Sequence, residues 1–546
     1  MFNSRIPTLI CLILTFFSCR NEQKNPGDEI SFEEKSIGEL AETSAIAGFF
    51  SDSTETKKLN LRSTEAVADF YKTGGYEPVW KTHQLREDLY SGIRAISEEG
   101  LEPEDYNEEY LRNSLTNLSS LYGQERVRLE ILLTDSFYQL LHDLYYGKLN
   151  PEALYEIWDI KKEDIEISML MKKAFDNEGI TEVLNSVKPH HPVYNGLKKS
   201  LAEFNSALAS EESGEKITHI EEGQIIKPGE EDTRIPSVVK RLKELNISVD
   251  TDSVTSAYTP AIEQAVKNFQ EKYGLEIDGI VGSGTIRNLN KTREDRREQI
   301  LANLERWRWF PRDFGNHYII VNIPNYQLTV VREGNTISKH KVMVGVQARK
   351  TPVFSDEIEY VVYNPTWTIP PTIKKNDVIP GAAKDISYLR NRNLKVYSSS
   401  GETIDPSSID WNSGEALKYT YRQEAGSTNP LGRVKIIYPN QYLIYLHDTP
   451  SKALFERNSR AQSSGCVRVQ DAIGLSKYLL SNREQYSSEK IDSIIASGKT
   501  TKVEVTQPVN VYHLYWTAWR ENNKTKFTED IYNTDEEILN LLQKNQ

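Results

Sequence analysis

The sequence predicts a multidomain α+β protein whose second half is mostly β. Three observations lead to this prediction. The chain has 546 residues, which is more than one hydrophobic core usually accommodates. Apolar residues follow a helical spacing from about 60 to 205 and alternate with polar ones after 317. A polar, acidic stretch with glycine and proline at 206–235 lies between these regions and is typical of a linker.

The overall composition excludes some classes of function. Apolar residues make up 38% of the chain and charged residues 27%, as in an ordinary soluble protein. The formal net charge is −13, and no long run of lysine and arginine occurs. Because binding to a phosphate backbone requires cationic side chains that displace counterions, we do not expect nucleic acid as a partner.

The first residues predict export. Arg5 precedes a short, mostly apolar stretch at 6–17, which is too short to span a bilayer but suits a signal peptide. Ser18 stands directly before Cys19, after which the sequence turns polar. Residues 1–19 resemble the signal of bacterial lipoproteins, which implies acylation of Cys19 and a periplasmic protein held on a membrane face by lipid. A plain secretory signal with an incidental cysteine is the alternative.

A tether and a helical domain are expected next. Residues 20–58 are rich in Glu, Ser, Lys and Asn without sustained periodicity, which predicts a flexible tether. Residues 59–205 predict a helical scaffold domain without catalytic spacing. Its clearest element is a long helix that ends near Gly147, before Pro151. The apolar face of this helix is formed by Leu129, Leu132, Leu133, Phe137, Leu140, Leu141 and Leu144.

A small three-helix domain is predicted at 236–292. Thr259 is suited to cap the second helix, with Pro260 at its first position. Gly279 and Gly282 in "DGIVGSGT" indicate a tight turn into the third helix. The "AVKNFQ" and "DGIVGSGT" segments resemble the signatures of the peptidoglycan-binding domain 1 family. Peptidoglycan as the ligand is implied by this resemblance, not by the helical pattern.

The predicted β domain covers 317–506. Its first segment, "HYIIVNIPNYQLTVVREGNTISKHKVMVG", alternates apolar and polar residues and has a hairpin turn at Glu333, Gly334 and Asn335. Further strands are expected in "IEYVVYNPTW" and in "RVKIIYPNQYLIYLHD". These short alternating segments are typical of a half-buried sheet.

Two other parts of this region are expected to be distinct. A polar stretch at about 374–430 is too long for an ordinary connection, so we expect a lid or subdomain over a site. Residues 507–546 are expected to form a C-terminal extension with a strand pair and a short helix.

Cys466 is the first candidate for catalysis. It is the only cysteine expected to remain a free thiol in the mature chain, because Cys11 lies within the signal and Cys19 at the lipidation site. It therefore has no partner for an intramolecular disulfide in an oxidising compartment. Such a leftover cysteine is either a small apolar filler or a reactive thiol.

The residues around Cys466 fit the reactive alternative. Gly465 leaves the backbone amides approachable for an oxyanion. A thiol of ordinary pKa needs a base or a positive neighbour, and His447, at the end of the preceding strand, is a candidate base. The backbone carbonyl or the carboxylate of Asp448 could orient its imidazole. Considered without a family, Cys466 is as consistent with an inert thiol as with a nucleophile.

A resemblance to a known family favours the nucleophile. "HDTP" and "SSGCVRV" resemble the catalytic motif of YkuD-type L,D-transpeptidases, and the resemblance covers 317–506. "NPTWTIPPTI" and "NPLGRVKIIYPN" resemble further segments of this family. The order of scaffold, peptidoglycan-binding domain and catalytic domain resembles the large YcbB-like, or LdtD-like, subgroup.

The resemblance implies a role for each residue of the motif. Cys466 is expected to be the nucleophile and His447 the general base that later acts as an acid. The amides of Gly465 and Cys466 are expected to form the oxyanion hole. Many family members have histidine where this chain has Ser464; the subgroup accepts serine there, but the change leaves the polar network around the thiolate open.

Substrate contacts are also implied by the resemblance. Arg468 is expected to hold a substrate carboxylate or to fix the loop; a surface ion pair is the alternative. Tyr445 and Trp367 are expected to line the donor groove, together with Ser464. For the two aromatic residues, plain core packing is the alternative.

The implied reaction is acyl transfer in two halves. The thiol attacks the carbonyl of the third stem-peptide residue, expels the terminal D-Ala and forms a thioester. The amine of a second stem's diamino acid then attacks and gives a 3→3 cross-link. No metal or other cofactor is implied, since the histidines form no metal-binding motif.

Two other functions stay open at this point. Water or a protein lysine as the acceptor would make the enzyme an L,D-carboxypeptidase or a protein-attachment enzyme. A non-catalytic wall-binding anchor is the second alternative, although the presence of both Cys466 and His447 speaks against it. Expected partners are peptidoglycan stem peptides, the membrane and peptidoglycan synthases, and the protein is expected to be a monomer.

Overall fold

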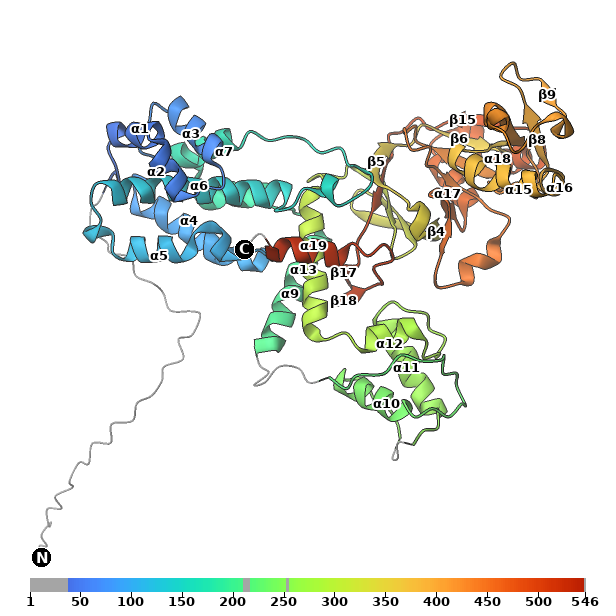
Figure 1. Ribbon diagram of the computed structural model, residues 1–546, viewed down its shortest axis with the longest axis horizontal. Coiled ribbons are helices and arrows are strands. Elements are labelled where there is room, and N and C mark those ends of the chain that lie inside the picture. The colour runs from blue at the N-terminus through green and yellow to red at the C-terminus, as the bar shows by residue number, and fades with distance from the viewer. Residues whose placement is uncertain (1–37, 210–216, 252–254, 545–546) are drawn as a thin grey trace, which may run out of the picture.

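The computed structural model describes residues 38–209, 217–251 and 255–544. The predicted signal, Cys19 and the first part of the tether lie outside the described residues. Figure 1 shows a helical bundle, a small helical unit and a β region, with the long helix α13 passing between them. This arrangement confirms the predicted multidomain α+β fold.

The predicted scaffold domain is a helical bundle around α6. The predicted long helix is confirmed as α6, which ends at Gly147 with a φ of +90°; a backbone with positive φ favours glycine. The helices of this part are α1 (Thr43–Ser51), α2 (Ser53–Leu59), α3 (Thr64–Thr73), α4 (His83–Ala95), α5 (Glu108–Thr116), α6 (Gln124–Tyr146), α7 (Ile167–Lys173), α8 (Ile180–Val187) and α9 (Pro192–Ala209).

The prediction of a flexible tether up to residue 58 is wrong for its second half. Helices α1 and α2 occupy that part of the chain, and Ile46 and Phe49 are buried in the same core as α6. The two side chains lie three positions apart and share one helix face. This stripe is too short to stand out from its polar surroundings in the sequence.

The predicted three-helix domain is confirmed as α10 (Ile235–Glu244), α11 (Pro260–Lys272) and α12 (Ser283–Leu289). The hydroxyl of Thr259 accepts a hydrogen bond from the amide of Ile262 at 3.4 Å, as expected of the N-cap of α11.

The predicted linker at 206–235 is not a free connection over the part that the structure describes. Helix α9 continues to Ala209, and Ile220 and Ile226 are buried in the core of the small domain. Ile226 forms an isolated bridge with Val281. The acidic residues around these two isoleucines make the segment polar on average, which is why its composition predicted a linker. Burial of two such side chains nevertheless contributes several kcal/mol to the stability of the fold.

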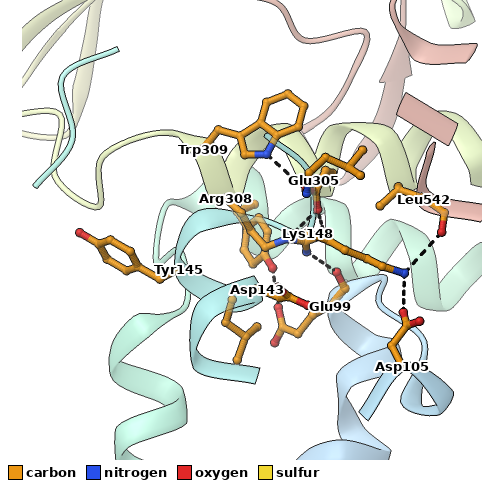
Figure 2. Close-up of polar contacts among 12 residues, drawn as sticks. Glu99, Asp105, Asp143, Tyr145, Lys148, Glu305, Arg308, Trp309 and Leu542 are labelled. Atoms are coloured by element: carbon orange, nitrogen blue, oxygen red, sulfur yellow. Dashed lines mark hydrogen bonds and ion pairs between the residues drawn. The ribbon is translucent and has the colours of Figure 1, made fainter. Parts of the chain in front are cut away.

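Helix α13 (Arg293–Trp309) packs against both the scaffold bundle and the C-terminal part of the chain. It contacts α6, α9 and the C-terminal helix α19 (Asp535–Lys544). Within α13, the buried guanidinium of Arg308 pairs with the carboxylate of Glu305 at 2.5 Å and donates to the carbonyl of Glu99 at 2.8 Å (Figure 2). Burial would lower the pKa of Arg308, but Glu305 holds it above its ordinary value.

A second polar contact fixes the C-terminal helix α19 against the scaffold bundle. The ammonium of Lys148 donates to a carboxylate oxygen of Asp105 at 2.6 Å and to the carbonyl of Leu542 at 3.4 Å (Figure 2). The scaffold, α13 and the C-terminal helix are therefore held together by buried charge-assisted hydrogen bonds.

Among the described residues, twelve strands form the central sheet. Their order is β1-β5-β16-β2-β3-β4-β14-β12-β11-β6-β15, and β13 pairs with β4. The strands are β1 (Trp158–Asp159), β2 (His317–Asn322), β3 (Gln327–Arg332), β4 (Asn335–Gly345), β5 (Val353–Glu357), β6 (Tyr360–Tyr363), β11 (Val434–Ile437), β12 (Leu446–His447), β13 (Ala461–Ser463), β14 (Val467–Val469), β15 (Thr501–Glu504) and β16 (Asn510–Leu514). Helix α17 (Ala472–Leu479) contacts β11, and α18 (Ser488–Ala496) precedes β15.

Strand β16 lies inside the central sheet although its residues belong to the predicted C-terminal extension. It pairs in parallel with β2 and antiparallel with β5. The end of the chain thus contributes to the core of the β region. The rest of the extension forms the antiparallel pair β17 (Ala518–Glu521) and β18 (Lys524–Phe527), followed by α19.

The long polar stretch between β6 and β11 is a subdomain with its own sheet. This sheet consists of β7 (Trp367–Thr368), β10 (Thr420–Gln423), β8 (Leu394–Tyr397) and β9 (Thr403–Ile404), in that order. The helices α14 (Pro371–Ile373), α15 (Ile379–Lys384) and α16 (Ser387–Asn391) complete it. A separate hydrophobic cluster forms its core.

One ion pair joins this subdomain to the central region, between Arg349 and Asp377 at 2.8 Å. Within the part of the chain that the structure describes, no helix has the length and apolar character needed to cross a membrane.

Candidate functional site

The candidate site lies on two neighbouring strands at the middle of the central sheet. Strand β12 pairs in parallel with β14, and His447 is opposite Arg468 in this register. Tyr445 lies beside Cys466, since its carbonyl accepts the amide of Val467 at 3.1 Å. Side chains alternate along a strand and match across the ladder. Cys466, Arg468, Tyr445 and His447 therefore share one face of the sheet.

His447 is buried, with 4% of its surface exposed. Its Nδ1 lies 2.6 Å from the backbone carbonyl of Asp448. A carbonyl only accepts hydrogen bonds, so Nδ1 carries the proton and Nε2 keeps a free lone pair. This contact decides between the two orienting groups left open by the sequence, because the Asp448 carboxylate instead accepts from the amide of Arg433 and from Lys452.

The imidazole is neutral at physiological pH. Burial, followed by the positive charges of Arg468 and Lys435, lowers the pKa of His447 to about 3, against a smaller opposing effect of the Asp448 carbonyl. A neutral imidazole with one nitrogen fixed as a donor can accept a proton at the other nitrogen. His447 thus has the protonation state of a general base.

Cys466 is half-buried and lies next to a hydrogen-bond acceptor. Its Sγ is 3.5 Å from the carbonyl of Leu443, to which the thiol donates. Burial raises the pKa of the thiol, and hydrogen bonds from Tyr445 and the charges of Lys435 and Arg468 act in the opposite direction. The resting site therefore holds a neutral thiol and a neutral imidazole, and ionisation of the thiol has to accompany attack on a substrate.

The loop before Cys466 is held by a chain of hydrogen bonds. Gly465 has a φ of +112°, a conformation that favours glycine. The amide of Gly465 donates to Oγ of Ser463 at 3.2 Å, and this hydroxyl donates to the carbonyl of Cys466 at 2.6 Å. The Gly465 amide is thus engaged by Ser463, and its predicted role in an oxyanion hole requires it to turn towards a substrate.

A further hydroxyl fixes this loop from the other side. Thr351 donates from Oγ1 to the carbonyl of Gly465 at 2.8 Å. The amide of Thr351 in turn donates to the hydroxyl of Tyr532 at 3.1 Å, and Tyr532 donates to the carbonyl of Gly345 at 2.7 Å. The C-terminal extension therefore supports the loop that carries the thiol.

The structure places the other predicted residues as follows. Arg468 faces the thiol side, its Nη1 is 3.9 Å from the sulfur of Met343, and its buried Nε has no hydrogen-bond partner among the described residues. Tyr445 is buried, and its pKa is raised well above 10 by burial and by Cys466, against a hydrogen bond from Trp367. Trp367 lies on β7 at the base of the subdomain. Ser464 is exposed on the loop.

Two residues near the thiol were missed by the sequence reading. Lys435 lies opposite His447 on β11, with its ammonium 3.8 Å from the ring centroid of Tyr445. In "RVKIIY", Lys435 alternates with the buried Val434 and Ile436 and so lies on the other face of the strand, which was a usable signal. Leu443 has a φ of +57°, which is unfavourable for leucine and often marks a functional site. Its sequence gives no hint of this conformation.

Three family models match the chain. Residues 65–201 match a "Scaffold domain", residues 232–289 a "Putative peptidoglycan binding domain" and residues 316–505 an "L,D-transpeptidase catalytic domain". The candidate site lies within the third of these ranges.

Among curated proteins, the chain is similar to a "Putative L,D-transpeptidase" of Haemophilus influenzae. The two are 38% identical over 242 residues, which cover 44% of this chain and 49% of the relative. The chain therefore spans about half the length of the curated relative that it matches.

Two solved structures are also similar. An L,D-transpeptidase of Xylanimonas cellulosilytica is 14% identical, with a TM-score of 0.15, and covers 54% of this chain and 99% of its own. An L,D-transpeptidase of Stackebrandtia nassauensis is 11% identical, with a TM-score of 0.19, and covers 53% of this chain and 94% of its own. At such TM-scores these likenesses add nothing to the assignment.

Proposed function

We propose that this protein is a cysteine-dependent transpeptidase of peptidoglycan, because residues 316–505 match the model of an L,D-transpeptidase catalytic domain and follow ranges that match scaffold and peptidoglycan-binding domains. The observation that carries the proposal is the placement of Cys466 and His447 on one face of paired strands, with Nδ1 of His447 fixed by the Asp448 carbonyl. Nε2 then remains to accept the thiol proton.

The first half-reaction acylates the enzyme. His447 Nε2 takes the proton from Cys466 while Sγ forms a bond to the carbonyl carbon of the third stem-peptide residue. The carbonyl oxygen becomes an oxyanion, which backbone amides of the 463–466 loop stabilise. When the tetrahedral species collapses, the bond to the terminal D-Ala breaks, and the imidazolium returns its proton to the leaving amine. A thioester on Cys466 remains.

The second half-reaction transfers the acyl group. The amine of a diamino acid on another stem attacks the thioester and gives up a proton to His447, and the thiol leaves with that proton. The product is a 3→3 cross-link. Water in place of the amine would release a tripeptide, and a protein lysine would attach a protein to the wall; both alternatives use the same site.

Arg468 supports the proposal by its chemistry. Its guanidinium faces the thiol side, and its buried Nε is without a partner among the described residues. An unsatisfied buried donor is costly, and a substrate carboxylate would satisfy it. Tyr445 and Trp367 would then contact the donor stem beside it, under the subdomain that begins at β7.

We propose the periplasmic face of a membrane as the location, with Cys19 as the lipid attachment point. The apolar stretch before Cys19 and the polar stretch behind it support export and acylation. The intact mass of the protein purified from membranes tests this: a mature chain that begins at Cys19 and carries added acyl mass is expected. A chain of unmodified mass would contradict lipidation.

The function is tested with purified muropeptides and mass spectrometry. The wild-type protein is expected to release D-Ala and to form a 3→3 dimer. Cys466→Ala is expected to abolish both products and to keep binding to isolated sacculi. If neither product forms with the wild type, the non-catalytic anchor is the better function; D-Ala release without a dimer favours the carboxypeptidase.

A further inference from the structure

A large groove lies between the small helical domain and the C-terminal hairpin. Neither Cys466 nor His447 is among its lining residues. It has a volume of about 660 Å³. Its walls come from α9, from α11 and the end of α10, from the start of α13 and from β18. Strand β18 lies outside the three ranges that match family models. The α10 and α11 walls belong to the range that matches the peptidoglycan-binding model, whereas the walls from α9, α13 and β18 have no assigned role in binding.

Specific contacts fix the hairpin against the helical walls. Arg520 of β17 forms a bidentate ion pair with Glu203 of α9 at 2.7 and 2.8 Å. On the other side, Arg287 of α12 pairs with Glu529 at 2.9 Å. Gly274 approaches the hairpin so closely that a Cβ there would lie 2.5 Å from the carbonyl of Phe527. The groove is therefore a built feature with fixed walls.

The floor of the groove combines aromatic rings with a buried cation. The guanidinium of Arg296 lies 4.6 Å from the ring centroid of Tyr273 and 4.9 Å from that of Phe527. The two rings are stacked with centroids 6.3 Å apart. Arg296 also donates to Oδ1 of Asn288 at 2.8 Å. These contacts fix the position of the Arg296 side chain in the lining of the groove.

The lining has an excess of positive charge in a chain with a net charge of −13. The cationic residues of the lining are Lys272, Lys291, Arg293, Arg296, Lys524 and Lys526. The acidic ones are Glu203, Glu244 and Glu271. Of these, Glu203 is already paired with Arg520 and Glu244 with Arg241 at 3.1 Å, and neither arginine lines the groove.

Three lysines of the groove lining are available for a ligand. Lys291, Lys524 and Lys526 form no ion pair with any residue that the structure describes. Burial lowers the pKa of Lys291, which marks it as partly withdrawn from water. A positive groove on an acidic protein concentrates anions locally.

We propose that this groove binds the carboxylate-bearing stem peptide of a peptidoglycan strand, with the C-terminal hairpin completing a site that the helical domain alone lacks. The inference rests on the proposed function for the identity of the polymer. Lys524 and Lys526 on one wall and Lys291 on the other bind the peptide carboxylates. The site holds the polymer at a place distinct from the thiol.

The test uses the full chain with Cys466→Ala, so that no turnover occurs, and a tetrapeptide muropeptide that carries a photoreactive diazirine. After irradiation, mass spectrometry maps the adducts. Adducts are expected on α11 and β18 in addition to any in the catalytic domain. The double variant Lys524→Glu/Lys526→Glu is expected to lose the groove adducts and to bind about tenfold more weakly there, as loss of two screened attractions and gain of two repulsions predicts.

The matched control is Lys490→Glu/Lys499→Glu, which makes the same change of charge at exposed lysines of the catalytic domain. This variant is expected to keep the groove adducts, and circular dichroism checks that both variants are folded. Adducts confined to the catalytic domain, or equal labelling of the groove in both double variants, would overturn the proposal. A peptide-free glycan that protects the groove from labelling would also overturn it.

The two proposals fail separately. D-Ala release from a soluble tetrapeptide by the protein with an intact Cys466 tests the function alone. Groove labelling without such release would refute the proposed reaction and leave the binding site in place. Release of D-Ala without groove labelling would support the proposed reaction and refute the proposed binding site.

Discussion

At the scale of single residues, burial keeps Cys466 and His447 neutral at rest, while two nearby cations make the thiolate form of Cys466 easier to reach. Burial acts against both a thiolate at Cys466 and an imidazolium at His447. Lys435 and Arg468 favour the thiolate and disfavour the imidazolium. We therefore expect the positions of Lys435 and Arg468 on the neighbouring strands to matter as much as the proposed pair of Cys466 and His447.

Replacement of Lys435 tests this effect of charge. In Lys435→Met, loss of the positive charge is expected to raise the pKa of the Cys466 thiol, because the thiolate loses a stabilising partner. At a fixed pH near 8, alkylation of Cys466 by iodoacetamide should then slow severalfold, because a smaller fraction of the thiol is ionised. Lys435→Arg keeps the charge and should keep the rate. An unchanged pH profile of alkylation in the Met variant would count against this role.

We expect Thr351 to position the loop that carries Cys466, the proposed nucleophile. Thr351→Val removes the hydroxyl that donates to the Gly465 carbonyl and accepts the amide of Gly345 at 2.8 Å. Leaving buried groups unsatisfied costs about 1–3 kcal/mol, and kcat is expected to fall with little change in KM. Thr351→Ser keeps the hydroxyl and should restore kcat. Equal kcat values in the Val and Ser variants would contradict this role.

At the scale of elements, β16 carries a pH-sensitive contact into the centre of the sheet. His513 is fully buried, its Nε2 lies 2.9 Å from the hydroxyl of Tyr438, and its ring stacks on Phe354 at 4.6 Å. Burial lowers the pKa of His513 from an ordinary 6.5 to about 3. The stability contributed by this strand therefore requires a neutral imidazole.

Acid is expected to destabilise the β region through this histidine. Between pH 6.5 and pH 3 the unfolded chain binds a proton at His513 that the folded chain excludes, so the free energy of unfolding falls as pH falls. His513→Gln should reduce this slope by up to about 1.4 kcal/mol per pH unit, reached below about pH 6, where the unfolded histidine is mostly protonated. Urea unfolding between pH 7 and pH 5 measures it, and His219→Gln, at an exposed position, is the control. The same slope in both variants would refute the contribution of His513.

At the scale of the whole molecule, the parts are joined by buried polar contacts as well as by apolar surface. The carboxylate of Glu305 pairs with Arg308 and accepts from the indole of Trp309 at 3.2 Å (Figure 2). It also accepts from the amide of Leu149 at 2.8 Å. These contacts connect α13 with the chain that follows α6. The scaffold can thus hold a fixed orientation relative to the catalytic sheet.

Removal of one charge from this joint should have a large effect. Glu305→Gln leaves Arg308 buried without its counter-charge, which typically costs about 3–5 kcal/mol. A clear decrease in the midpoint of thermal unfolding and faster proteolysis between the scaffold and the sheet are expected. Glu298→Gln, on the same helix and half-exposed, is the control. Similar midpoints for the two variants would show that the pair does not hold the joint.

The sequence predicted those features that depend on local patterns. The long helix α6, the cap at Thr259 and the separate subdomain between β6 and β11 all follow from spacing or length. The Cys466 and His447 pair was found through a motif. In contrast, α1 and the placement of Ile220 were missed, because only a few apolar residues in each segment contact a distant core.

The order of the domains and the choice of Cys466 and His447 as proposed nucleophile and base came from the sequence, since both are encoded in short stretches of chain. The tertiary structure alone decided that β16 enters the sheet, that Lys435 lies beside the reacting pair and that a cationic groove forms at the hairpin. The physical reason is that a sheet and a groove bring together residues far apart in the chain. The strand register and the burial that shift the pKa values of these residues exist only once those segments have paired.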